Sequence, residues 1–286
     1  MLWLNGNLRD ENDAPIAVSS AGNLLGWGVF TTIGVWNARP FALDLHLQRL
    51  RHDAKIAHIE YSIADETLRQ AVRETIDANH VSRGIARLTV SRRGDGRWNK
   101  ADGSDVCVLA QNMATKNRVN DLRVNDLRVA LSPFVLNSRS AVGGIKTTSY
   151  LEHQLAYLDA QNRGCDEAIL CNERGEIGEG ARANVFWVRD GTLKTPWLQS
   201  GCLPGIARHL ILGWARESAI PTREESGDLD ELLQADEVFF TSSSAGIRGV
   251  REVLREIGSA RNIVFPSAKP VTSQLQKRWQ NEVEAA

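Results

Sequence analysis

The stretch EGARANVFWVRDGTLKTPWLQSGCLPGIAR, residues 179–208, says most about the fold of this 286-residue chain. It begins with an acidic residue, Glu179, placed just before the apolar run NVFWV, which is typical of a buried strand. The turn RDG (189–191) then joins this strand to a second short one. Pro204 lies where a helix over 204–219 would begin, a position at which its missing N–H costs nothing. The stretch therefore predicts a hairpin that leads through a tight loop into a helix.

On both sides of this stretch, helical and strand patterns follow one another without a regular alternation. Apolar residues at helical spacing predict helices over 43–59, 64–79, 148–164, 204–219, 228–234 and 267–284. Apolar or β-branched runs bounded by turn residues predict strands over 84–92, 105–111, 127–133, in short pieces over 166–195, and from 235 into the small-residue turn TSSSAG. This mixture indicates an α+β fold with hairpins rather than repeated strand–helix–strand units.

A polar segment near the middle of the chain is the predicted domain boundary. It carries the pentapeptide RVNDL twice, at 118–122 and 123–127, and two copies are too few for a repeat architecture. The residues before it already supply both a sheet and covering helices. We therefore expect a smaller N-terminal domain over 1–115, a linker over 116–126 and a larger C-terminal domain over 127–286.

The composition excludes several classes of protein. The 34 Lys and Arg nearly balance the 35 Asp and Glu, giving a net charge of −1, so no basic surface for nucleic acid or anionic lipid is expected. The four cysteines are far apart with no CxxC pair, which argues against a metal site and a disulfide framework. No apolar run is long enough to span a bilayer, and the N-terminus lacks the apolar core of a signal peptide. These features are typical of a soluble cytoplasmic protein.

Polar residues at several strand and helix ends are candidates for a functional site. Lys146 follows AVGGI, and a buried lysine loses its proton and becomes a nucleophile, although most lysines are solvent-facing loop residues. Glu179 is equally compatible with an exposed turn. The loop GCLPGIAR (201–208) and the turn TSSSAG (241–246) both suit an anion, with ordinary capping as the alternative. Arg49 lies one position off the apolar stripe of its helix, where a solvated position is the default.

The order of these residues along the chain resembles that of one enzyme family. E179-GARA-N184-V-F186, L193-K-T195 and L203-P-G205-I206-A-R208 resemble the signature of the class IV aminotransferases, the fold-type IV pyridoxal-phosphate enzymes, in both residue types and spacing. GWGVFTT (26–32), HLQRL (46–50), GIKTTSYLEHQLA (144–156) and ADEVFFTSSSAGIRGV (235–250) agree with it. The resemblance extends from about Leu4 to Val250. It implies two domains with the active site between them, usually in a homodimer.

The resemblance also implies roles for individual residues. Lys146 is the catalytic residue that forms a Schiff base with pyridoxal 5'-phosphate and moves the proton through a quinonoid intermediate. Glu179 pairs with the pyridine nitrogen, so that the ring can act as an electron sink. Arg49 binds the cofactor phosphate. The other implied cofactor-binding residues are Gly205, Ile206, Ala207, Ser243, Asn184 and Tyr150, although Tyr150 is one residue closer to the lysine than in branched-chain relatives.

The substrate is the least determined part of this interpretation. An aminotransferase that moves an amino group between an amino acid and a 2-oxo acid is the principal hypothesis, and Thr31 and Arg97 are the predicted substrate contacts. The segment FTT (30–32) differs from the FEG of branched-chain transaminases, which disfavours that subfamily. It resembles aminodeoxychorismate lyases, which make 4-aminobenzoate and pyruvate, and SRRGDGR (91–97) is also similar to a lyase loop. The lyase is therefore the alternative. A catalytically silent relative that acts as a binding module is a third hypothesis, which the presence of both Lys146 and Glu179 disfavours.

Overall fold

The computed structural model divides the chain into two compact units, each of which is described by itself. It describes residues 1–15, 17–94, 103–113, 126–254 and 262–285. Unit 1 comprises Met1–Arg118, Ile145–Ser149 and Val283–Ala286, and unit 2 comprises Val119–Gly144 and Tyr150–Glu282. The expected domain boundaries stay a prediction, and most of the expected linker lies outside the described residues. The segment that carries Lys146 packs with unit 1, although it lies far along the chain from the rest of that unit.

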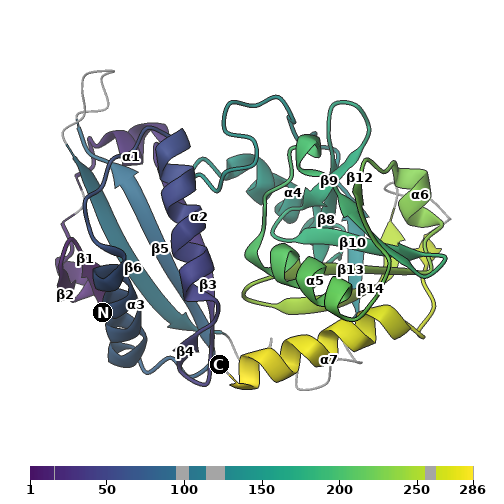
Figure 1. Ribbon diagram of the computed structural model, residues 1–286. Coiled ribbons are helices and arrows are strands. Elements are labelled where there is room, and N and C mark those ends of the chain that lie inside the picture. The colour runs from purple at the N-terminus through teal and green to yellow at the C-terminus, as the bar shows by residue number, and fades with distance from the viewer. Residues whose placement is uncertain (16, 95–102, 114–125, 255–261, 286) are drawn as a thin grey trace. The chain divides into compact units, whose positions relative to one another are not determined.

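Unit 1 is an antiparallel sheet covered by two helices on one face (Figure 1). In sheet order the strands are β2 (Asn7–Arg9), β1 (Leu2–Leu4), β6 (Ser104–Asn112), β5 (Gly84–Arg92), β3 (Gly28–Trp36) and β4 (Arg39–Pro40). The helices are α1 (Ala21–Leu25), α2 (Leu43–Ile56) and α3 (Asp65–Ala78), with a 3-10 turn at Glu11–Asp13. The predictions of α2, α3, β5 and β6 are thus confirmed within a few residues, whereas β3 was not predicted as a strand.

The core of unit 1 follows from side-chain periodicity. Alternate residues of β3, β5 and β6 face the helices, because successive side chains of a strand point to opposite faces. α2 and α3 contribute one apolar stripe each, and the acidic first turn of α3 complements its dipole. The members from these elements are Val29, Ile33, Val35, Leu43, Leu47, Leu50, Ala54, Leu68, Ala71, Val72, Ile76, Ala86, Leu88, Val90, Val106 and Val108. The central strand β3 is therefore held against α2, which fixes the position of polar residues on both.

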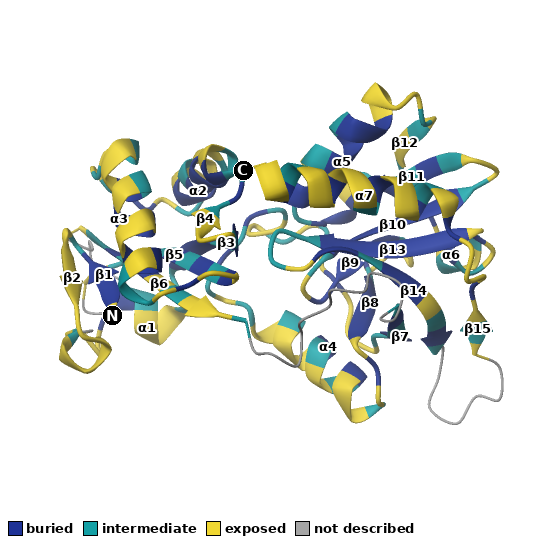
Figure 2. Cartoon of the chain, turned by 90° about the horizontal axis from the view of Figure 1, so that it is seen from below, coloured by how far each residue is buried: buried dark blue, intermediate teal, exposed yellow. Residues whose placement is uncertain are grey.

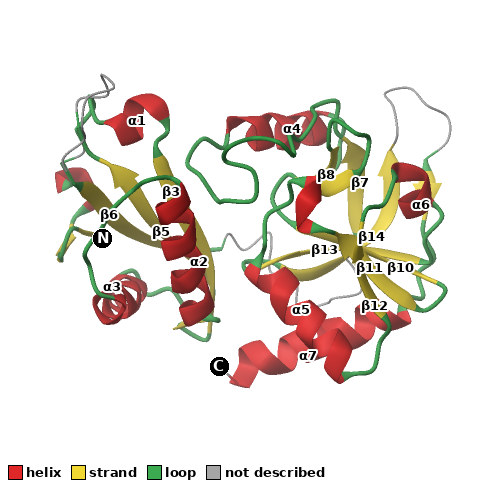
Figure 3. Ribbon diagram, turned by 45° about the horizontal axis from the view of Figure 1, so that its top comes forward, coloured by secondary structure: helices red, strands yellow, loops and turns green. Residues whose placement is uncertain are grey.

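Unit 2 contains a larger mixed sheet of nine strands (Figure 3). In sheet order they are β12 (Thr222–Glu225), β11 (Thr192–Pro196), β10 (Asn184–Arg189), β13 (Glu237–Ser242), β14 (Gly246–Leu254), β7 (Leu127–Leu131), β8 (Glu167–Cys171) and β9 (Ile177–Gly180), while β15 (Ile263–Val264) pairs with β14. Pairs β11–β12, β14–β7 and β7–β8 are parallel, and the other pairs of the sheet are antiparallel. The expected hairpin of residues 184–196 is confirmed.

Helices pack on this sheet and bury its strands. They are α4 (Leu151–Asn162), α5 (Ile206–Glu217), α6 (Leu229–Leu233) and α7 (Pro270–Ala285), with a 3-10 turn at Leu198–Ser200. α4 packs on β7 and β8, and Trp214 of α5 meets Trp279 of α7 edge-on with ring centroids 5.8 Å apart. Figure 2 shows β10 and β13 as buried strands, and Phe186 and Phe239 on them stack with centroids 5.0 Å apart. Within the described part of the chain, no helix is long and apolar enough to cross a membrane.

Candidate active site

The segment that carries Lys146 runs beside strand β3 of unit 1. The amide of Phe30 donates to the Lys146 carbonyl at 2.9 Å, and the amide of Thr148 donates to the Gly28 carbonyl at 2.8 Å. A Cβ on Gly28 would come within 2.8 Å of the Thr148 hydroxyl, so this close approach requires glycine. Two backbone hydrogen bonds thus hold the Lys146 segment at the edge of strand β3. A catalytic nucleophile must be held in one position in this way.

The Lys146 side chain is half-buried against an aromatic ring. Its Nζ lies 4.8 Å from the ring centroid of Phe30, which is itself buried. The Arg87 guanidinium lies over the same ring, 3.6 Å from the centroid. A lysine nitrogen over the face of an aromatic ring is attracted by the ring quadrupole, which helps to fix the position of Nζ.

Arg49 lies on the same unit, with its side chain only 9% exposed. Its Nη2 donates to the Thr31 hydroxyl at 3.0 Å, and that hydroxyl is also 2.6 Å from Nδ1 of His46. Burial, with smaller contributions from the charges of Arg49 and Lys146, holds the pKa of His46 well below its usual range. Arg49 and Lys146 both belong to unit 1, and the cofactor roles expected of them stay predictions. The role of Thr31 as a substrate contact stays a prediction, since its fully buried hydroxyl faces His46 and Arg49.

Glu179 lies in unit 2, at the end of β9, and is only 7% exposed. Its Oε2 accepts a hydrogen bond from the Leu203 amide at 3.0 Å and lies 3.4 Å from Nδ2 of Asn184. Its Oε1 lies 3.3 Å from Nε2 of His153 on α4. Groups from three separate elements therefore fix the orientation of this carboxylate. The sequence analysis identified Glu179 and Asn184 but missed His153.

Tyr150 supports the same cluster. Its ring stacks on the ring of His153, with centroids 4.5 Å apart and planes 14° apart. Its hydroxyl donates to the Ala181 carbonyl at 3.3 Å. The expected cofactor contact of Tyr150 stays a prediction, but its place beside the Glu179 cluster is a finding of the structure.

The N-terminus of α5 lies next to this cluster. Gly205 is the N-cap residue, and no side chain caps the helix there, so the first N–H groups have no intrahelical acceptor. Ile206 and Ala207 are both buried. Nδ2 of Asn184 donates to the Leu203 carbonyl at 2.8 Å, which holds the loop that enters the helix. Uncapped backbone donors and the helix dipole make this end suitable for a phosphate.

The turn after β13 completes the set of polar groups in unit 2. Ser243 is half-buried, and its neighbours Ser242 and Ser244 contact each other at 3.3 Å. Thr241 pairs in register with Asn184, so the two side chains lie on the same face of the sheet. Thr241 is 2% exposed, and its hydroxyl has no hydrogen-bond partner among the residues that the structure describes. A buried hydroxyl without a partner indicates a site where a polar ligand supplies one. Sequence analysis missed Thr241, although it opens the TSSSAG turn.

These residues fit pyridoxal 5'-phosphate. Unit 1 offers a lysine that suits its aldehyde and an arginine that suits its phosphate. Unit 2 by itself offers a buried carboxylate that suits the pyridine nitrogen, and an uncapped helix end and hydroxyls that suit a phosphate. Arg97, the other expected substrate contact, lies outside the described residues.

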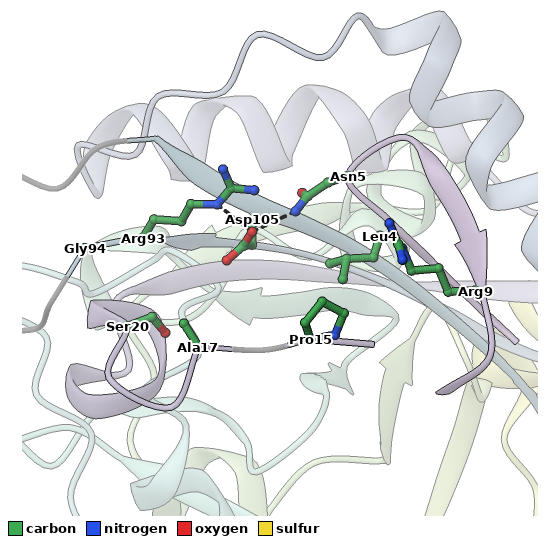
Figure 4. Close-up of a pocket in the computed structure, with 9 residues that line it drawn as sticks. All are labelled: Leu4, Asn5, Arg9, Pro15, Ala17, Ser20, Arg93, Gly94 and Asp105. Atoms are coloured by element: carbon green, nitrogen blue, oxygen red, sulfur yellow. Dashed lines mark hydrogen bonds and ion pairs between the residues drawn. The ribbon is translucent and has the colours of Figure 1, made fainter. Parts of the chain in front are cut away.

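A surface pocket of unit 1 is separate from these groups (Figure 4). It has a volume of about 600 Å³. Asp105 within it accepts hydrogen bonds from Arg93 and Asn5, each at 2.7 Å. Its described lining residues are Leu4, Asn5, Arg9, Pro15, Ala17, Ser20, Arg93, Gly94 and Asp105, and none of them was predicted as a site residue.

Comparison with known proteins identifies the family. The family model for amino-transferase class IV matches residues 28–253. A branched-chain-amino-acid aminotransferase of Salmonella typhimurium is 31% identical over 291 residues, covering 97% of this chain and 91% of its own. An aminodeoxychorismate lyase of Bacillus subtilis is 30% identical over 251 residues, covering 85% of this chain and 83% of its own.

A solved structure agrees with the sequence relatives. The branched-chain aminotransferase of the archaeon Thermoproteus uzoniensis, solved with norvaline, has a TM-score of 0.88 and 30% identity, covering 99% of this chain and 94% of that one. The chain therefore belongs to the class IV aminotransferases. It has the fold-type IV architecture and is a pyridoxal-phosphate-dependent aminotransferase that acts on amino acid and oxo acid substrates.

Proposed function

We propose that this aminotransferase takes its amino group from an apolar α-amino acid of the branched-chain type and gives it to a 2-oxo acid. The observation that carries the proposal is the similarity to a branched-chain-amino-acid aminotransferase, and the Phe30 ring, 4.8 Å from Nζ of Lys146, adds an aromatic group beside the reacting amine. Similarity to a branched-chain-amino-acid aminotransferase along 97% of the chain supports the same substrate class. The segment FTT differs from the FEG of that subfamily at two of three positions and argued against it on the sequence alone, and we give more weight to the similarity along the whole chain.

The proposed roles follow from what each group can do. When bound, pyridoxal phosphate supplies an electron-withdrawing ring that stabilises negative charge at the substrate Cα. Lys146 anchors the cofactor through Nζ and, once free, moves the proton at Cα by general acid–base chemistry. Glu179 holds a proton at the pyridine nitrogen. Arg49, the N–H groups of Ile206 and Ala207, and Ser243 bind the phosphate.

The role of Lys146 is tested by reduction of the loaded enzyme. Borohydride should fix the cofactor covalently onto Lys146, which peptide mass mapping would locate. Lys146→Ala should lose that adduct, while Lys194→Ala, which removes a lysine paired with Glu225 at 2.8 Å, should keep it. An unchanged adduct in Lys146→Ala would overturn the assignment.

The substrate class is tested with single substrates. Addition of leucine, isoleucine or valine without an acceptor should convert the enzyme to its pyridoxamine form, seen by absorption, and a 2-oxo acid should restore it. Failure with all three, together with turnover of an acidic amino acid, would contradict the proposed apolar substrate class.

Aminodeoxychorismate lyase remains the second candidate function. The FTT segment and the 30% identity to the Bacillus subtilis lyase favour it. Release of 4-aminobenzoate from aminodeoxychorismate in the absence of any amino acceptor would establish the lyase reaction and replace the proposal above.

We also infer that the enzyme is a cytoplasmic homodimer. The balanced composition supports a cytoplasmic location, and the family resemblance supports a dimer. Sedimentation at micromolar concentration should give twice the chain mass of 31.6 kDa, and fractionation of the source cells should place the protein in the cytoplasm.

A further inference from the structure

Asp53 is a buried carboxylate of unit 1 that lies next to Lys146 and Arg49, the two residues of this unit with proposed cofactor contacts. Asp53 lies on α2 and has an exposed fraction of 0%. Its Oδ2 accepts a hydrogen bond from the backbone amide of Lys146 at 3.1 Å. The same oxygen lies 4.0 Å from Nε of Arg49. A charged group is costly to bury, so a fully buried carboxylate among apolar core residues requires compensation from its neighbours.

The spacing along the chain explains how one residue contacts both. Arg49 and Asp53 are four residues apart and therefore lie on the same face of α2. Lys146 is 93 residues further along the chain and comes to α2 only because its segment pairs with β3. Asp53 thus links the lysine segment to the helix that carries the arginine.

The other end of Arg49 is held by groups with no role in the proposed reaction. Its Nη2 donates to Thr31 of β3, whose hydroxyl contacts His46, one turn before Arg49 on α2. Thr31 and His46 are both fully buried. With Asp53 on one side and Thr31 on the other, the guanidinium has a fixed orientation before any phosphate arrives. Such preorganisation reduces the entropic cost of binding.

We propose that Asp53 is a positioning residue for the cofactor, which holds the Lys146 backbone and the Arg49 guanidinium in their binding orientations. This inference rests on the proposed roles of Lys146 and Arg49. It assigns to Asp53 no contact with cofactor or substrate.

The charge of Asp53 gives the proposal a spectroscopic consequence. The charged groups that face its carboxylate are Arg49 and His52 of α2 and Lys146 of the neighbouring segment. Burial raises the pKa of Asp53, while the Lys146 amide and the nearby positive charges act in the opposite direction. A negative charge near Lys146 favours the protonated state of its nitrogen, so removal of that charge should lower the pH at which the nitrogen loses its proton.

Two substitutions separate this role from a purely structural one. Asp53→Leu removes both charge and acceptor. Because leucine is larger than aspartate and Arg49 would lose its carboxylate partner, this variant should also lose stability, so its fold is checked first. Asp53→Asn keeps the shape and an acceptor but removes the charge. Asp44→Asn is the matched control, because Asp44 lies on the same helix but is 67% exposed at its side chain and pairs with Arg69.

Three measurements are made on each protein: the dissociation constant of pyridoxal phosphate, the pH midpoint of the visible absorption band, and hydrogen exchange at the Lys146 amide without cofactor. Asp53→Asn should weaken cofactor binding about tenfold and lower the pH midpoint by about one unit. Asp53→Leu should weaken binding at least as much and also remove exchange protection at Lys146. Asp44→Asn should change none of these quantities.

The outcomes distinguish this inference from the proposed function. Folded Asp53 variants that bind the cofactor within twofold of wild type, with an unchanged pH midpoint, would overturn the positioning role. If the wild-type chain binds no pyridoxal phosphate, the proposed function fails, and exchange at Lys146 still reports whether Asp53 holds its backbone. If both variants fail to fold, an unprotected Lys146 amide in the wild type would overturn the proposal, and protection equal to that of the α2 amides would support it.

Discussion

Nε2 of His153 lies 3.3 Å from Oε1 of Glu179, so a histidine on α4 holds the carboxylate proposed to face the pyridine nitrogen. The histidine ring is itself held by stacking on Tyr150. Residues such as His153 orient the groups that contact a cofactor. They therefore affect the chemistry of the cofactor without touching it.

We expect His153→Leu to lower kcat about tenfold, because Glu179 would lose one of its three partners. His153→Gln, which restores a side-chain donor, should recover most of that loss. His209→Leu on the exposed surface of α5 is the control. Equal kcat values for His153→Leu and wild type would show that Leu203 and Asn184 suffice to hold the carboxylate.

Glu179→Gln tests the electron-sink role directly. The amide is nearly isosteric, so the substituted enzyme should still bind pyridoxal phosphate and keep the Leu203 contact on its oxygen. It cannot hold the pyridine proton as a carboxylate does, so the proton transfer at Cα should slow by a factor of about a hundred or more. Stopped-flow absorption with a Cα-deuterated amino acid isolates this step. A rate within severalfold of wild type would contradict the assignment.

Gly205 and Gly213 form a matched pair on the same helix. A Cβ on Gly205 would lie 2.0 Å from Oδ1 of Asn184, whose amide contacts Leu203 and Glu179. A Cβ on Gly213 would meet nothing within 4 Å. Gly205→Ala should therefore displace Asn184 and weaken cofactor binding about tenfold, with about 1–3 kcal/mol lost from the free energy of unfolding.

Gly213→Ala should instead stabilise the protein by about 0.5–1 kcal/mol without affecting the cofactor, because alanine is favoured inside a helix. Urea titration gives the free energies, and fluorescence titration gives the cofactor affinities. Equal cofactor affinities in the two variants would mean that the close approach at Gly205 has no part in phosphate binding.

The sequence predicted the groups that lie within one continuous motif and missed those that depend on long-range packing. Glu179, Asn184 and the start of α5 lie within 30 residues, and their order resembles the family signature, which is what indicated a site. Asp53 lies on the predicted helix 43–59, but its contact with Lys146 depends on a segment 93 residues away. The feature of the sequence that marked Asp53 was an acidic residue three positions after Leu50, on the apolar side of the helix.

Strand β3 was missed for a related reason. Residues 28–36, GVFTTIGVW, are almost continuously buried, so they lack the alternation of apolar and polar residues that marks a half-exposed strand. The close approach of the Lys146 segment, at Thr148, shows why a glycine occurs at position 28. His153 gave no local signal, because α4 has no clear apolar face against which a polar residue would stand out.

The last prediction concerns pH and stability. Burial holds the pKa of His46 well below its usual value of 6.5 in the folded protein, whereas the unfolded chain should titrate near that value. Below this pH the unfolded state binds more protons than the folded one, so acid favours unfolding. The contribution of a neutral His46 is therefore fully present above about pH 6.5 and is lost as the pH falls below it, by up to about 1.4 kcal/mol per pH unit.

His46→Asn should remove this dependence, because Asn offers the Thr31 hydroxyl a polar partner but does not titrate. The free energy of unfolding in urea, measured at half-unit steps from about pH 7.5 to about pH 5, should fall less steeply for this variant than for wild type. His52→Gln, a substitution at a neighbouring and exposed histidine of α2, provides the comparison. If the free energy of unfolding falls with pH equally steeply in His46→Asn and wild type, other groups cause the acid sensitivity. Removal of a histidine that stays neutral in the folded state must make that slope shallower.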